Sequence, residues 1–68
     1  MFEVTKNNVK ILLSSPFRVA DYVYENSHNW DMSYWFINKC KNMRVGEFDI
    51  VIEEFTVDGV AIKIKRVS

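Results

Sequence analysis

Residues 15–43 read SPFRVADYVYENSHNWDMSYWFINKCKNM, and the spacing of their apolar side chains predicts two helices in succession. Ser15 followed by Pro16 is a typical helix start, because serine caps free backbone N–H groups and proline fits the first turn. The first helix is expected to end near Asn26, and the second is expected over Trp30–Met43. The segments on either side of this pair carry the alternating patterns of strands.

Trp35 falls on the polar side of the second predicted helix, between Asp31 and Lys39. The opposite side is a continuous apolar face made of Met32, Phe36, Ile37, Cys40 and Met43. Asn29 is the expected cap, and the acid in the first turn and the lysines in the last turn suit the helix dipole. Exposing a Trp forgoes roughly 1.5–3 kcal/mol of burial. We therefore expect Trp35 to contact a partner; the alternative is that it packs against the first helix or covers a chain end.

The first predicted helix also has an apolar and a polar side. The apolar arc holds Phe17, Val19, Ala20, Val23 and Tyr24, and the polar arc holds Arg18, Asp21, Tyr22 and Glu25. If the helices pack side by side, Tyr22 and Trp35 share one outer surface with Arg18 nearby. Trp, Tyr and Arg are enriched at binding hot spots. The expected partner-binding residues are Arg18, Tyr22, Asp31, Trp35 and Lys39.

The N-terminal segment predicts a hairpin. Residues Phe2–Thr5 alternate between apolar and polar, Lys6-Asn7-Asn8 is a turn signal, and residues 9–13 alternate again. The competing interpretation is a helix over Asn8–Leu13.

The C-terminal segment predicts a second hairpin, with Asp58-Gly59 as its two-residue loop. Phe48, Ile50 and Ile52 are expected to point into the core. This loop pairs Val57 with Val60 and Phe55 with Ile62, but continuing the register would place Glu53 on the buried face. A β-bulge at Glu53–Glu54 would correct this and align Ile52 with Ile64.

The expected architecture is a single α+β domain over residues 1–68, with the element order ββααββ. An antiparallel sheet of two hairpins carries both helices on one face. If the first hairpin is misread, the order becomes βααββ.

Composition narrows the function classes. Nine basic residues balance nine acidic ones among 68, and this neutrality argues against nucleic-acid binding. The chain has a single cysteine, Cys40, which excludes an intrachain disulfide and metal clusters of the Cys/His kind. We therefore expect the protein to lie in a reducing cytoplasm. We expect it to bind neither a cofactor nor a metal ion. The start MFEVTKNNVK lacks the signal-peptide pattern, and no apolar run approaches the length of a membrane span.

For each group that could take part in catalysis or metal binding, the sequence favours a non-catalytic role. His28 lies in a polar turn without a partner to orient it, although a ribonuclease-type role with Tyr34 or Arg44 stays open. Cys40 lies on the core face, where a thiol is usually inert. The acids at Glu47, Asp49, Glu53, Glu54 and Asp58 are expected to be solvated; a minority interpretation is that they mimic nucleic-acid phosphate.

A basic strip of Lys10, Lys63, Lys65 and Arg66 is expected if the two hairpins are neighbours. Such strips bind single strands when aromatic rings lie among the cations. Here Phe2, Phe48 and Phe55 are expected on the core side, which weakens a nucleic-acid interpretation based on this strand.

In size, in aromatic and Asn content and in lacking a motif, the whole chain resembles the small accessory proteins of tailed phages. That class includes inhibitors of host polymerases, nucleases and CRISPR effectors, and the resemblance implies a protein that binds and modulates a host protein. The sequence thus predicts a non-catalytic protein-binding module, with a homodimer as one form of partner. A nucleic-acid-binding domain is the alternative, and an enzyme would depend on His28 alone.

Overall fold

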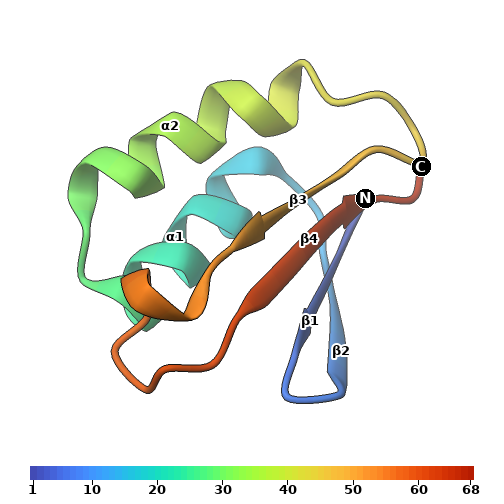
Figure 1. Cartoon of the computed structure of the whole chain (residues 1–68). Helices are drawn as coiled ribbons and strands as arrows, with labels where there is room; N and C mark the ends of the chain where they lie inside the picture. The colour runs from blue at the N-terminus through green and yellow to red at the C-terminus, as the bar shows by residue number, and fades with distance from the viewer.

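Four antiparallel strands and two helices make up the fold, in a computed structural model that describes residues 1–68 (Figure 1). In chain order the elements are β1 (Phe2–Lys6), β2 (Val9–Leu13), α1 (Pro16–Ser27), α2 (Trp30–Lys41), β3 (Phe48–Val51), the short 3₁₀ helix η1 (Glu53–Phe55) and β4 (Ile62–Arg66). The two helices pack together against one face of the sheet. The expected α+β class, with the order ββααββ, is confirmed.

The N-terminal hairpin forms as predicted, and the alternative helix over Asn8–Leu13 is wrong. Asn7 and Asn8 both have positive φ, of 52° and 65°, which is the backbone that a two-residue hairpin turn requires. This turn pairs Lys6 with Val9 and carries the register to Phe2 opposite Leu13.

The strand order is β2-β1-β4-β3, so the first and last strands of the chain are hydrogen-bonded neighbours. Val4 lies opposite Ile64, and Lys6 lies opposite Ile62. Residues directly opposite each other share a face of the sheet. The β1–β4 pairing therefore aligns one apolar face across both hairpins.

Both helices start where the sequence predicts. The Ser15 Oγ accepts a hydrogen bond from the Arg18 N–H at 3.3 Å, and the Asn29 Oδ1 accepts one from the Met32 N–H at 3.0 Å. Helix α2 ends at Lys41, before the predicted end at Met43. Neither helix combines the length and apolar character that crossing a bilayer needs.

The core lies between the helices and the inner face of the sheet. Its buried side chains are Phe2, Val4, Val19, Val23, Phe36, Cys40, Met43, Val51, Ile62 and Ile64. The helices meet at Ser33, a buried polar residue whose hydroxyl donates to the Ala20 carbonyl oxygen at 2.7 Å. Met43, beyond the end of α2, still fills the core as its apolar position predicts.

The predicted orientation of β3 is wrong. Val51 is buried, with 2% of its surface exposed, whereas Phe48, Ile50 and Ile52 are exposed. The cause is the register with β4: Val51 lies opposite the buried Ile62, so it must share that inner face. Phe48 and Ile50 consequently lie on the face turned away from the helices.

The predicted two-residue hairpin loop and the β-bulge at Glu53–Glu54 are also wrong. Residues 52–61 connect β3 to β4, and they include η1 where the bulge was expected. Asp58-Gly59 does form a turn, with Gly59 at φ 72° and the Val60 N–H donating to the Asp58 Oδ1 at 3.1 Å. That turn lies inside the longer connection and joins no paired residues.

Candidate protein-binding surface

The outward face of α2 exposes three large aromatic side chains. Trp30, Tyr34 and Trp35 have 62%, 67% and 53% of their surface exposed. The helix buries its other side, through Ser33, Phe36 and Cys40. Aromatic rings of this size bury about 150–250 Å² each when covered, so this face carries a large unused contact area.

Trp35 is exposed, as its position on the helix predicts. Its ring meets Phe36 edge-on, with 5.0 Å between centroids, and the Lys39 Nζ lies 5.8 Å from the ring centroid. Lys39 also lies 4.0 Å from an Asp49 carboxylate oxygen on β3. Asp31 is exposed on the same helix. Three of the five predicted partner-binding residues therefore belong to α2 and its border with β3.

Arg18 and Tyr22 lie elsewhere, so the predicted shared surface with Trp35 does not form. Tyr22 is half-buried and packs against the core. Arg18 borders a shallow hollow beside Leu12 and Leu13 of β2, at the opposite edge of the sheet from β3. The apolar arc of α1 is rotated relative to the prediction, since Phe17 is exposed as well.

A cluster of rings closes the corner between the two helices. The Tyr24 and Trp30 ring centroids are 4.3 Å apart, Trp30 and Tyr34 are 6.5 Å apart, and Tyr24 and His28 are 6.1 Å apart. We call Tyr24, His28, Trp30 and Tyr34 the aromatic corner. Trp35 lies on the same helix as Trp30 and Tyr34 and adds a further exposed ring.

The turn between the helices fixes the aromatic corner. His28 adopts the left-handed conformation at φ 52°, and its N–H donates to the Tyr24 carbonyl oxygen at 2.7 Å. The Ser27 hydroxyl donates to the Val23 carbonyl oxygen at 2.6 Å and accepts from the Asn29 N–H at 3.2 Å. These bonds and the Asn29 cap define the backbone of the turn that carries His28 between Tyr24 and Trp30.

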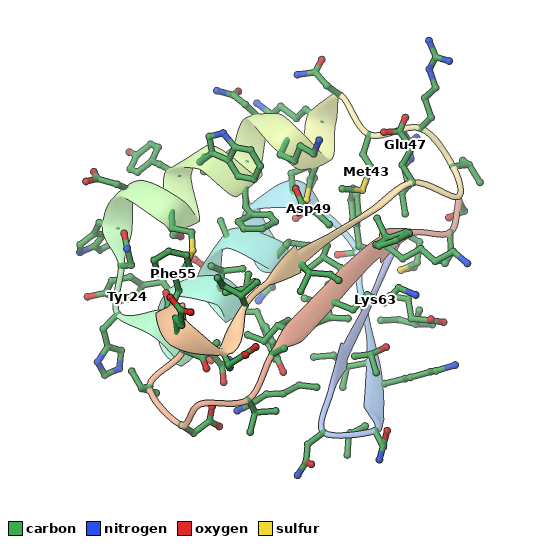
Figure 2. All side chains as sticks on the ribbon, in the orientation of Figure 1. Tyr24, Met43, Glu47, Asp49, Phe55 and Lys63 are labelled. Carbon is green, nitrogen blue, oxygen red and sulfur yellow. The ribbon has the colours of Figure 1, made fainter.

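Hydrogen bonds and an ion pair hold the connection between β3 and β4 close to the aromatic corner. The Val57 N–H donates to the Asn26 carbonyl oxygen at 2.8 Å. Lys6 donates to the Asn26 Oδ1 at 2.8 Å and forms an ion pair with Asp58. The Lys6 hydrogen bond, followed by that from the Val60 N–H, lowers the pKa of the Asp58 carboxyl below its ordinary value. Figure 2 accordingly shows Phe55 and Tyr24 at the same end of the molecule.

Sequence reasoning missed Trp30, Tyr34 and Tyr24 as parts of this surface. The signal for two of them was present, because Trp30 and Tyr34 lie one turn apart on the wheel, outside the apolar face. Tyr24 was expected on the apolar arc of α1, facing the core. Its role at the corner depends on how the interhelical turn brings Trp30 back over it, which wheel positions do not describe.

The two candidate catalytic side chains lie in different surroundings, with Cys40 in the core and His28 on the surface. Burial, with a smaller contribution from the Asp49 carboxylate, raises the pKa of the Cys40 thiol to about 11, so the thiol is protonated near neutral pH. The His28 ring lies in the aromatic corner on the surface. No group of His, Cys, Asp and Glu side chains is placed to share a metal ion.

The sheet face turned away from the helices, here called the open face, carries part of the expected basic strip. Register places Lys65 beside Phe48, and Lys63 between Ile50 and Thr5, which lies opposite Lys10. The Lys63 Nζ lies 4.7 Å from the Phe48 ring centroid.

Arg66 does not join this strip. Its guanidinium donates to the Met43 carbonyl oxygen at 2.6 Å and to the Ser68 carbonyl oxygen at 3.0 Å.

Comparison of the chain with models of known protein families, with curated proteins and with solved structures gives no match.

Proposed function

We propose that this chain is a non-catalytic protein-binding module, and that its contact surface is the outward face of α2 together with the aromatic corner. The observation that carries the proposal is the exposure of Trp30, Tyr34 and Trp35 on one short helix. Trp and Tyr are the residue types most enriched at binding hot spots, because each ring gives a large contact area and costs little side-chain entropy.

The geometry of the surface suits a partner that packs against exposed aromatic rings. The rings project from a capped helix whose backbone is fixed, so little ordering cost arises on binding. Asp31 and Lys39 lie on the same helix and supply charges at the rim, where they contribute to orientation more than to affinity. A module of this kind acts by occupying its partner, in keeping with the phage accessory proteins that the chain resembles and with a cytoplasmic location.

Affinity capture with matched variants tests this proposal. Immobilised wild type, Trp30→Ala, Trp35→Ala and the control Leu12→Ala are exposed to lysate after circular dichroism has shown that all four fold. Leu12 is equally exposed, but it lies on β2 at the far edge of the sheet. We expect one protein to be retained by wild type and control and lost with either Trp variant.

The captured protein is then purified, and its affinity is measured by calorimetry. Loss of at least about tenfold in affinity for Trp30→Ala or Trp35→Ala agrees with hot-spot behaviour. Equal affinity for all four proteins contradicts the proposal. Concentration-dependent dimerisation abolished by the same two substitutions would identify the partner as a second copy.

Nucleic-acid binding at the open face is the second candidate, and one observation favours it. Phe48 lies on the open face beside Lys63 and Lys65, although the sequence predicted it in the core. A ring among cations suits the stacking of single strands. Binding of an oligothymidine that weakens steeply with salt and is lost in Lys63→Glu/Lys65→Glu would support this candidate. Retention of binding in that variant would remove it.

A further inference from the structure

The exposed aromatic rings fall into two groups, those covered by a lysine of the chain and those that are not. Lysine ammonium groups lie over Trp35, Phe17 and Phe48, at 5.8, 5.1 and 4.7 Å from the ring centroids. No cation of the chain lies over Trp30 or Tyr34, although these rings are at least as exposed as Trp35. The exposed faces of Trp30 and Tyr34 are therefore open to a cation from outside, which such rings attract through their quadrupoles.

The charged residues that follow Tyr24 and Trp30 in the sequence are acidic. Glu25 follows Tyr24 on α1, and Asp31 follows Trp30 on α2. Both carboxylates are exposed, and neither forms an ion pair. Glu53 and Glu54 extend this acidity, because they directly precede Phe55 in η1, and Phe55 lies at the same end of the molecule as Tyr24 (Figure 2).

The basic residues are engaged or lie elsewhere. Lys6, which reaches Asn26 at the end of α1, is held by Asp58 and Asn26. Lys39 pairs with Asp49, and Lys10 pairs with Glu3. Lys63 and Lys65 belong to the open face of the sheet. A chain with zero net charge thus has one end that is aromatic and acidic, which repels phosphate and attracts cations.

We propose that the aromatic corner, with Glu25, Asp31, Glu53 and Glu54 around it, binds an arginine-rich segment of another protein. This inference rests on the proposed function and names the chemistry of its partner. An arginine stacks its planar guanidinium on the exposed Trp30 and Tyr34 rings while nearby carboxylates accept hydrogen bonds from its edge. Charge complementarity selects a basic protein segment over a nucleic acid at this end.

Nuclear magnetic resonance of the indole N–H groups tests the inference, because the chain has two tryptophans and only one lies in the aromatic corner. The folded full chain is titrated to millimolar concentration with a short Arg-Gly repeat peptide. The matched probe is the same peptide with citrulline, which keeps the shape of arginine without its charge. We expect the Trp30 indole signal to shift with the arginine peptide, the Trp35 signal to shift much less, and the citrulline peptide to shift neither.

Variants separate the contributions of ring and charge. Asp31→Asn and Glu54→Gln are each expected to lower the affinity for the arginine peptide about two- to fivefold. Trp30→Ala is expected to lower this affinity by a similar factor or more. Glu47→Gln is the control, since Glu47 is exposed near the other end of α2 (Figure 2) and should leave the affinity unchanged.

Several outcomes overturn the inference. These are an unmoved Trp30 signal, equal shifts with arginine and citrulline, equal shifts of Trp30 and Trp35, or shifts traced to self-association of the chain. Failure here is distinguishable from failure of the proposed function. A captured protein that depends on Trp30, combined with no response to arginine, leaves the proposed function standing and removes only the arginine-rich partner.

Discussion

At the scale of single residues, Ser33 sets how closely the two helices approach. Its buried hydroxyl donates to the Ala20 carbonyl oxygen, so two small side chains face each other where α1 and α2 meet. A larger side chain at this position would push the helices apart and disturb every contact on the inner side of α2.

Two substitutions of Ser33 therefore distinguish the effect of the hydrogen bond from the effect of side-chain size. Ser33→Ala is expected to lower the free energy of unfolding by about 1 kcal/mol or less, because only one hydrogen bond is lost. Ser33→Leu is expected to cost more, about 1–3 kcal/mol, through overpacking. Urea unfolding followed by circular dichroism measures both. If Ser33→Leu is as stable as Ser33→Ala, the helix contact is looser than described.

Cys40 predicts a specific response to alkaline pH. The folded pKa of about 11 lies above the ordinary value of 9.0, so between these pH values the unfolded chain releases the thiol proton while the folded chain keeps it. The free energy of unfolding should then fall by up to about 1.4 kcal/mol per pH unit over this interval.

The control for this pH response is Cys40→Ala, which has no thiol and shares every other titrating group. We expect the difference in stability between wild type and Cys40→Ala to shrink as the pH rises through the interval. Parallel stability curves would show that the thiol does not stay protonated in the folded chain.

At the scale of elements, the caps of the helices are the best-determined local features. The Asn29 side chain satisfies the Met32 N–H and, with the Ser27 hydroxyl, defines the turn that holds the aromatic corner. Asn29→Ala is expected to cost about 1 kcal/mol of stability, within the range for cap removal. Thermal unfolding of Asn29→Ala beside Ser14→Ala, an exposed serine that caps no helix, measures the effect. Equal melting temperatures for the two variants would contradict the claim that the Asn29 cap stabilises the fold.

Elements defined by local chemistry were predictable from the sequence. Ser15-Pro16 and Asn29 determine the helix starts, and Asn7-Asn8 determines the first hairpin, because caps and positive φ depend on neighbouring residues alone. The orientation of β3 was not predictable in this way. Phe48 and Ile50 form an apolar alternation as regular as that of β1, yet the register with β4 turns them outward. Strand orientation depends on a partner distant in sequence, and here Asp58-Gly59 suggested the wrong pairing.

At the scale of the whole molecule, the net charge is zero, but basic and acidic residues lie on different parts of the surface. Lys63 and Lys65 lie on the open face of the sheet, whereas exposed acids follow Tyr24 and Trp30 of the aromatic corner. The positions of Trp35, Asp31 and Lys39 on one helix were predictable, because wheel positions follow from spacing. The packing of Tyr22 against the core was not, because tertiary packing sets the direction in which each helix faces its neighbour.

The footprint of a bound partner on this chain tests the central claim most directly. Both tryptophans lie on α2, so their two indole N–H signals report on the proposed surface without further labelling. On addition of the captured protein, we predict that both indole signals shift or broaden, together with the amide signals of Asp31 and Tyr34, while the amides of Lys10 and Lys63 on the open face stay in place. Unchanged indole signals, with the perturbation confined to the open face, would contradict the account and identify the sheet as the binding surface.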